Sequence, residues 1–319
     1  MINLPLGLVV LAITRRLRSR EADGEQRPID GVGVVLLIIT IAGLQLCLER
    51  GVGRSWSQSP ELFAEALAFV IALGGMAFRA RHFGFAVFRP AVFRDINFAV
   101  AAFYNFMLSG LVFVVIVFLP ALGEGPLGYT ATLAGFTIVP RAIFLMLMML
   151  MVGELIGKID HRLLLGVGWL LMAAGLAILA QLRPGDGILW MIIGSTVQSI
   201  GAGLLFTPHS TFAFATLAPE LRTDASGVFS LLRQLGCACG VALMTAVLRL
   251  EVNAHGGALT AGSGAVDGTA AQLFDLPTLL AYRDCFRMMA WAALVIIPGV
   301  FLFRPTGAST GRTDGAPIG

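Results

Sequence analysis

Apolar residues fall into eight long runs along the chain, separated by shorter polar segments. Each run is close to the roughly 20 residues that a helix needs to cross a hydrocarbon core of about 30 Å. Apolar and polar residues do not alternate within the runs, as they would in the strands of a membrane barrel. The pattern therefore predicts an all-α polytopic membrane protein with eight full transmembrane helices, at about Gly31–Leu48, Leu62–Phe78, Phe98–Pro120, Leu133–Ile156, Leu163–Gln181, Ile188–Thr216, Ser226–Leu248 and Phe286–Phe303.

The composition supports lipid as the surrounding solvent. Hydrophobic residues make up 57% of the 319 residues and charged residues 13%, and the mean hydropathy is +0.86. A soluble domain usually has about 25% charged residues. The composition excludes a soluble enzyme, a nucleic-acid-binding protein and a disordered chain, and the net charge of +3 does not indicate a polyanionic partner.

The basic residues indicate how the chain is oriented. Ile2–Ile13 is apolar but too short to span, and four arginines follow it, so we expect the cytoplasmic end of a partial N-terminal helix. If this cluster is cytoplasmic, 14 of the 22 basic residues fall on the same side. The positive-inside rule then predicts a multi-pass membrane protein with a cytoplasmic C-terminus.

No pattern in the chain predicts a catalytic site, a metal site or a cofactor. The four cysteines and four histidines lack metal-ligand spacing, and no nucleophile, base or metal ligands converge in any two spans. We therefore expect that the protein is not an enzyme. Turnover of a lipid-soluble substrate, abolished by a single polar substitution, would favour an enzyme instead.

Charged and polar residues inside the spans are the strongest functional signal, because an intramembrane charge is costly unless it faces protein or water. Arg141 could line a cavity, pair with another helix or extend its side chain to the interface. Arg233 lies nearer the cytoplasmic end, which favours a structural or gating role. Apolar and aromatic neighbours suit amphipathic substrates, although such side chains also face lipid. The candidate cavity residues are Arg141, Pro140, Gln198, Phe106 and Phe206.

Glycines within the spans indicate close helix contacts. Gly153 with Gly157, and Gly236 with Gly240, have the spacing of small residues that lets helix backbones approach, and "GAG" occurs at 201–203. These faces could serve plain packing or could let helices rock during transport. No acidic residue occupies the centre of a span. Proton coupling, which needs a titratable group in the membrane, is therefore expected elsewhere or in an absent part.

Six fragments, in order, resemble the fourteen-helix drug:proton antiporters of the major facilitator superfamily (EmrB/QacA type). "INLPLGL" resembles the end of the family's sixth helix, and "GYTATLAGFTIVP" introduces its tenth. "ELRTDASGVFSLLRQLGCACGVAL" resembles the start of the thirteenth. The fragments are Ile2–Leu8, Arg27–Gly51, Val92–Phe98, Gly128–Pro140, Glu220–Leu243 and Ala281–Trp291.

The resemblance implies that the chain is the second half of a major facilitator fold. Residues 1–30 would be a helix remnant and connector, and 31–97 two added helices with a cytoplasmic amphipathic segment. Residues 98–304 would form the C-terminal six-helix bundle with an external loop at 249–284, and 305–319 a disordered cytoplasmic tail. Conformational or gating roles would fall to Gly153, Lys158, Asp160, Arg162, Arg233, Gly236 and Gly240.

By this resemblance the protein is expected in a bacterial inner (plasma) membrane. The full-length form is expected to export multiple drugs or other amphipathic small molecules in exchange for protons. The chain itself is expected to be truncated and inactive alone, since the first helices of the family pattern have no counterpart. A misplaced start, a degraded gene and a split transporter remain open. The alternative is a half-transporter or regulatory subunit that pairs with a separately encoded N-terminal half.

Overall fold

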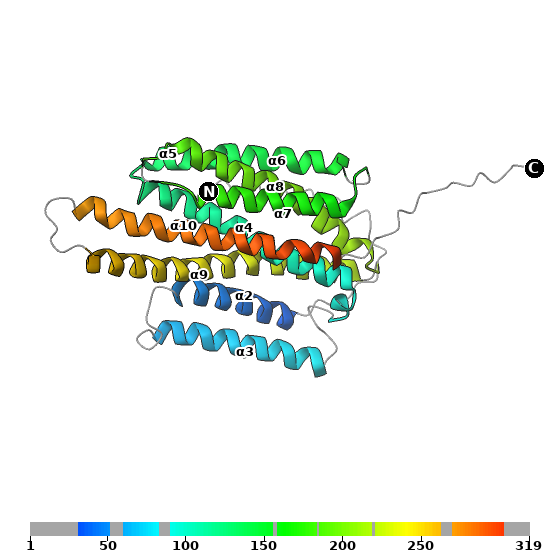
Figure 1. Ribbon diagram of the computed structural model, residues 1–319. Helices are drawn as coiled ribbons and strands as arrows, with labels where there is room; N and C mark the ends of the chain where they lie inside the picture. The colour runs from blue at the N-terminus through cyan, green and yellow to red at the C-terminus, as the bar shows by residue number, and fades with distance from the viewer. Residues whose placement is uncertain are drawn as a thin grey trace, which may run out of the picture.

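The computed structural model describes residues 31–51, 60–82, 90–155, 158–183, 185–218, 221–262 and 270–302. In these ranges the regular structure is helical, and the helices lie side by side (Figure 1). The prediction of an all-α polytopic protein is confirmed. The elements are α2 (Gly31–Gly51), α3 (Pro60–His82), η1 (Pro90–Arg94), α4 (Ile96–Glu124), α5 (Ala131–Phe136), α6 (Ile138–Leu155), α7 (His161–Leu179), α8 (Ile188–Ala215), α9 (Arg222–Gly262), α10 (Ala270–Ile296) and η3 (Ile297–Leu302).

Each predicted span corresponds to a helix, although two of these helices are less apolar than expected. Among the described residues, six helical stretches are long and apolar enough to cross a membrane. They are α3, α4, α5 together with α6, α7, α8 and α9. In α2 the apolar stretch is shorter, and α10 carries three charged residues in its central turns, namely Arg283, Asp284 and Arg287.

The prediction of an external loop at 249–284 is wrong for most of that segment. Helix α9 continues to Gly262 and α10 begins at Ala270, and the two helices pack against each other. The Gly, Ala and Thr content indicated a loop, but Ala is the strongest helix former. Residues 263–269 lie outside the described residues, as do the predicted N-terminal remnant and the C-terminal tail.

Helices α5 and α6 form one apolar stretch that is interrupted at Thr137. Pro140 lacks an N–H, and its ring clashes with the carbonyl four residues earlier, so a regular helix cannot continue through this point. The Thr137 hydroxyl donates a hydrogen bond to the carbonyl oxygen of Ala134 at 2.6 Å. This bond satisfies a carbonyl near the interruption and fixes the turn that precedes Arg141.

Glycines bring α8 into backbone contact with α7. A Cβ atom added at Gly175 would lie 2.6 Å from the carbonyl oxygen of Gly194 and 2.7 Å from Cα of Gln198. One added at Gly201 would lie 2.5 Å from the carbonyl oxygen of Gly168, and real Cβ contacts essentially never fall below 3.0 Å. The close approach predicted from the glycines of this helix is therefore confirmed.

The same kind of contact joins α4 to α9. A Cβ atom at Gly240 would lie 2.7 Å from Cα of Gly110, and one at Gly110 would lie 2.9 Å from the carbonyl oxygen of Gly236. The packing predicted from the spacing of Gly236 and Gly240 is confirmed, whereas a role in rocking stays a prediction. Figure 1 shows α2 and α3 as a pair along the edge beside α9, and α2 contacts α9.

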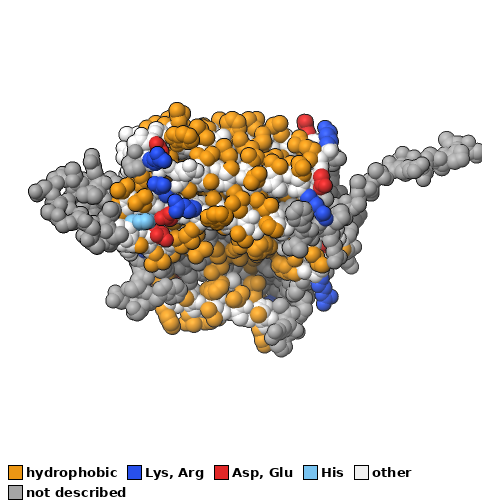
Figure 2. Space-filling view, viewed as in Figure 1, with side chains coloured by type: hydrophobic (Ala, Val, Ile, Leu, Met, Phe, Trp, Pro, Cys, Tyr) orange, Lys and Arg blue, Asp and Glu red, His pale blue; other side chains and the backbone are white. Residues whose placement is uncertain are grey.

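The surface of the molecule shows the banding expected of a chain in lipid. In Figure 2 hydrophobic side chains cover the middle of the visible face, while charged side chains gather toward the two ends of the helices. The lipid-facing character is clearest in α3, where Phe63, Val70 and Ile71 each expose more than half of their surface. Large apolar side chains of this kind are stable on a surface only against lipid or another apolar partner.

Candidate functional site

Arg141 lies in the interior of the bundle and joins three helices. Its side chain, on α6, is 3% exposed. The Nη2 group donates to the carbonyl oxygen of Val112 on α4 at 3.0 Å and to Oε1 of Gln198 on α8 at 3.2 Å. The Nε group donates to the same Oε1 at 3.4 Å. Two of the predicted cavity residues, Arg141 and Gln198, are therefore direct partners.

This contact lies near mid-depth in the bundle. Arg141 is ten residues from the start of α5, and Gln198 is ten residues from the start of α8. At 1.5 Å per residue both are about 15 Å from the nearer helix end, which is half of a hydrocarbon core of about 30 Å. The guanidinium group is thus held where water is scarcest.

Neutral oxygen atoms compensate for the burial of this charge. A central arginine costs about 2.5–3.5 kcal/mol on the insertion scale, and hydrogen bonds to charged groups contribute about 1.5–3 kcal/mol. The acceptors on Val112 and Gln198 are uncharged, so they stabilise the guanidinium without cancelling its positive charge. Gln198 is itself fully buried, and Gly175 closely approaches its backbone. The backbone that carries the acceptor is therefore held against α7.

The other three cavity candidates do not share this contact. Pro140 is partly buried and accounts for the interruption before Arg141. Phe206 is partly buried and packs against the apolar core, and Phe106 is partly buried where the α4 backbone meets Gly236 of α9. A hollow of about 300 Å³ lies elsewhere, between the end of α7, the start of α8 and the middle of α10, and none of the five candidates lines it. Its lining residues include Gln181, Arg183, Asp186, Trp190 and Arg283.

The predicted gating residues between α6 and α7 have different environments. Gly153, Lys158 and Asp160 are exposed, whereas Arg162 is partly buried. A Cβ atom at Gly153 would meet nothing within 4 Å, so the helix contact predicted there is absent from the described part of the chain. Asp160 caps α7, because its Oδ1 accepts a hydrogen bond from the backbone N–H of Arg162 at 2.9 Å.

The gating candidates on α9 differ in burial. Gly236 is buried, and Gly240 is partly buried against α4. Arg233 is exposed, although it lies only about 60° from Gly236 and about 20° from Gly240 around the helix. Its structural or gating role stays a prediction.

A scan against protein-family models matches residues 1–241 to the Major Facilitator Superfamily. The chain belongs to this superfamily.

Several export proteins of the superfamily are similar to this chain. The multidrug export protein EmrB of Escherichia coli is 27% identical, over 99% of this chain and 66% of its own length. EmrB of Haemophilus influenzae is 29% identical, over 76% of this chain and 48% of its own. Multidrug resistance protein 3 of Bacillus subtilis is 25% identical, over 85% of this chain and 53% of its own. The chain spans about half to two thirds of the curated relatives that it matches.

A cluster of rings in this superfamily member was not foreseen from the sequence. His209 stacks on Tyr104 with ring centroids 5.4 Å apart, and Trp169 meets His209 edge-on at 6.2 Å. The Nδ1 atom of His209 is 2.7 Å from the carbonyl oxygen of Leu205. The three residues come from α8, α4 and α7, and no local spacing links them.

A second unforeseen group joins α9 to α10. Glu251 and His255 on α9 meet Asp284 on α10. All three residues fall in the segment that was predicted to be a loop. The helical spacing of Glu251 and His255, four residues apart, was the available signal.

Proposed function

We propose that this chain forms part of a transporter that exports amphipathic small molecules across a bacterial cytoplasmic membrane in exchange for protons. The observation that carries the proposal is the match along nearly the whole chain to proteins named for multidrug export. The burial of Arg141 against Gln198 at mid-depth supports it, because intramembrane charges in transport proteins mark ligand pathways.

We assign Arg141 and Gln198 to the polar wall of the transport path. Among the described residues the guanidinium binds only neutral oxygens, so its positive charge has no counter-charge there and can attract an anionic group of a substrate or of a facing helix. Gly175 holds Gln198 against α7, which couples the position of the charge to the packing of α7 and α8. A movement between these helices would therefore change the environment of Arg141.

We further propose that coupled export needs a complementary bundle, since the relatives are longer than this chain. The test compares an efflux-deficient bacterium carrying the 319-residue reading frame with one carrying it together with its upstream DNA. Accumulation of a fluorescent amphipathic dye should fall only in the second strain. Proton-driven dye export by the 319-residue chain alone in proteoliposomes would contradict the need for a complementary bundle. No export from either strain would contradict the export function.

The role of Arg141 is tested in the strain that shows export. Arg141→Ala should change the substrate range or the transport rate. Arg141→Lys keeps the positive charge, so its transport should lie closer to that of the wild type. Arg183→Ala is the matched control, since that arginine is exposed in the loop before α8. Unaltered efflux of several compounds by Arg141→Ala would show that Arg141 serves packing alone.

A half-transporter that pairs with a separately encoded chain is the second candidate. The observation that favours it is that this chain matches only 66% and 48% of the length of the two EmrB relatives. Purification of the tagged protein from its native membrane, after cross-linking, should then recover a second polytopic chain. Recovery of this chain alone would count against it.

A further inference from the structure

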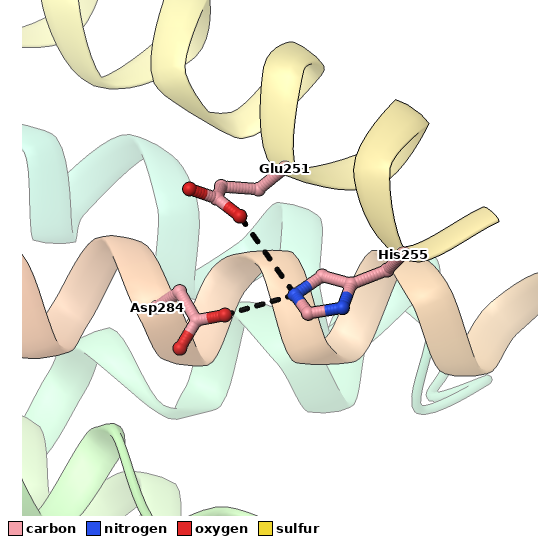
Figure 3. A group of neighbouring side chains, drawn as sticks. All are labelled: Glu251, His255 and Asp284. Carbon is pink, nitrogen blue, oxygen red and sulfur yellow. Dashed lines mark hydrogen bonds and ion pairs between the residues drawn. The ribbon is translucent and has the colours of Figure 1, made fainter. Parts of the chain in front are cut away.

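Three metal-ligating side chains converge where α9 and α10 lie together, and they belong to no part of the transport path described above. Figure 3 shows Glu251 and His255 projecting from α9 toward Asp284 on α10. Nε2 of His255 is 2.9 Å from Oδ2 of Asp284 and 3.8 Å from Oε2 of Glu251. One ligand atom from each residue lies within 4.8 Å of the other two.

These separations fit a small tetrahedral metal ion. Zinc binds imidazole nitrogen and carboxylate oxygen at about 2.0–2.2 Å, so neighbouring ligands in a tetrahedral site are about 3.3 Å apart. The two separations from His255, at 2.9 and 3.8 Å, lie on either side of this value. Small rotations of the side chains would therefore bring all three atoms to the coordination distance.

The surroundings also suit a metal site. The three side chains are between about one quarter and one third exposed, at 26% for Asp284, 30% for His255 and 34% for Glu251. An ion can reach them, and a water molecule can complete the coordination. Arg287 binds the other oxygen of Asp284, Oδ1, at 3.1 Å. It holds the carboxylate so that Oδ2 faces His255, as supporting groups do around metal ligands.

We propose that Glu251, His255 and Asp284 bind a divalent transition-metal ion, with zinc as the best match, and so link α9 to α10. One imidazole with two carboxylates selects zinc or a neighbouring metal over magnesium and calcium, which prefer oxygen ligands alone. His255 and Asp284 are 29 positions apart, so the spacing of Glu251 and His255 alone could not indicate the third ligand. The ion ties together two helices at the outer side of the membrane.

The test measures zinc binding directly, and it does not depend on transport. The full chain is purified in detergent without a polyhistidine tag, and Zn²⁺ is titrated against a chromogenic chelator. The variants are His255→Ala, Asp284→Asn and Glu251→Gln, each checked for retained helicity by circular dichroism. Glu124→Gln is the matched control, because Glu124 is an exposed carboxylate at the same side of the membrane, at the end of α4.

The wild type should bind one Zn²⁺ per chain, and Zn²⁺ should raise its thermal unfolding midpoint. Loss of a supporting group alone weakens metal sites about 10–100-fold, so each variant that lacks a ligand should lose at least about tenfold in affinity. Glu124→Gln should bind as the wild type does. The absence of saturable binding, wild-type affinity in His255→Ala and Asp284→Asn, or an equal loss in Glu124→Gln would each overturn the proposal. Conservative Asp284→Asn and Glu251→Gln keep the test decisive if His255→Ala fails to fold.

Discussion

The backbone contact between α4 and α9 gives a quantitative prediction for Gly240→Ala. The new methyl carbon would lie 2.7 Å from Cα of Gly110 and 3.0 Å from its carbonyl carbon and oxygen, whereas ordinary contact begins at 3.4 Å. The atoms that it meets are backbone atoms, which cannot rotate away. The two helices would have to separate locally by about 0.7 Å, or the methyl group would have to remain compressed.

Two opposing terms set the size of the effect. Overpacking a close-packed interior costs about 1–3 kcal/mol, while replacing glycine by alanine inside a helix gains about 0.5–1 kcal/mol. The matched control is Gly166→Ala in α7, where an added methyl carbon meets nothing within 4 Å. The control should therefore show the gain alone. The free energies of unfolding of the two variants should differ by about 1–3 kcal/mol, with Gly240→Ala the less stable.

The measurement is reversible unfolding in mixed micelles, with the denaturing detergent raised stepwise and the helicity followed by circular dichroism. Gly240→Ala should unfold at a lower fraction of denaturing detergent than the wild type, and Gly166→Ala at a similar or higher one. Equal midpoints for the two variants would show that α4 and α9 do not touch through their backbones, and the packing reasoning would fail. A lower unfolding midpoint for Gly240→Ala, with no lowering for Gly166→Ala, would support the packing reasoning.

Three further substitutions test single contacts by the same unfolding measurement. Gln198→Leu should lower the free energy of unfolding by about 1.5–3 kcal/mol, because the buried guanidinium loses an acceptor. Gln181→Leu, at an exposed glutamine, should change the free energy of unfolding little, and equal effects of the two substitutions would contradict this reasoning. Tyr104→Phe should cost about 0.5–1.5 kcal/mol through the lost hydrogen bond from its hydroxyl to the carbonyl oxygen of Ile296, and an unchanged midpoint would show that the bond adds nothing. Asp95→Ala should lower the free energy of unfolding by about 0.5–2 kcal/mol, because Asp95 caps α4 by accepting a hydrogen bond from the N–H of Phe98 at 3.1 Å. Asn can also cap a helix, so wild-type stability of Asp95→Asn would identify the cap as the cause, and a loss as large as in Asp95→Ala would contradict it.

The sequence predicted the helices well because the membrane imposes a length and an apolar composition on each of them. The same reasoning failed at 249–284, where the composition resembles a loop but the helices continue. Local spacing also found Gly236 and Gly240, which pack as a pair against one neighbour. Periodicity reveals such features because all of their determinants lie within one helix.

The polar contacts could be predicted only in part. Arg141 and Gln198 were each recognisable as polar residues in apolar surroundings, but their pairing depends on how α6 and α8 meet. Arg233 also lies in an apolar run of the sequence and yet is exposed, whereas Arg141 is buried. The direction that a side chain faces is set by the packing of several helices, which no spacing within a single helix encodes.

The interruption at Thr137 has a consequence for which helix can move. In the stretch formed by α5 and α6, only 17% of the apolar window is buried inside the bundle, compared with 61% in α4 and 56% in α8. Arg141 binds α4 and α8 four residues after the break, and further along α6 Met148 lies close to Gly203 while Val152 is fully buried. A change of angle at the break would therefore act first on the oxygen atoms around one charge, whereas the later part of α6 stays packed on α8. The polar contact of Arg141 thus lies one turn from the point where the helical stretch is weakest.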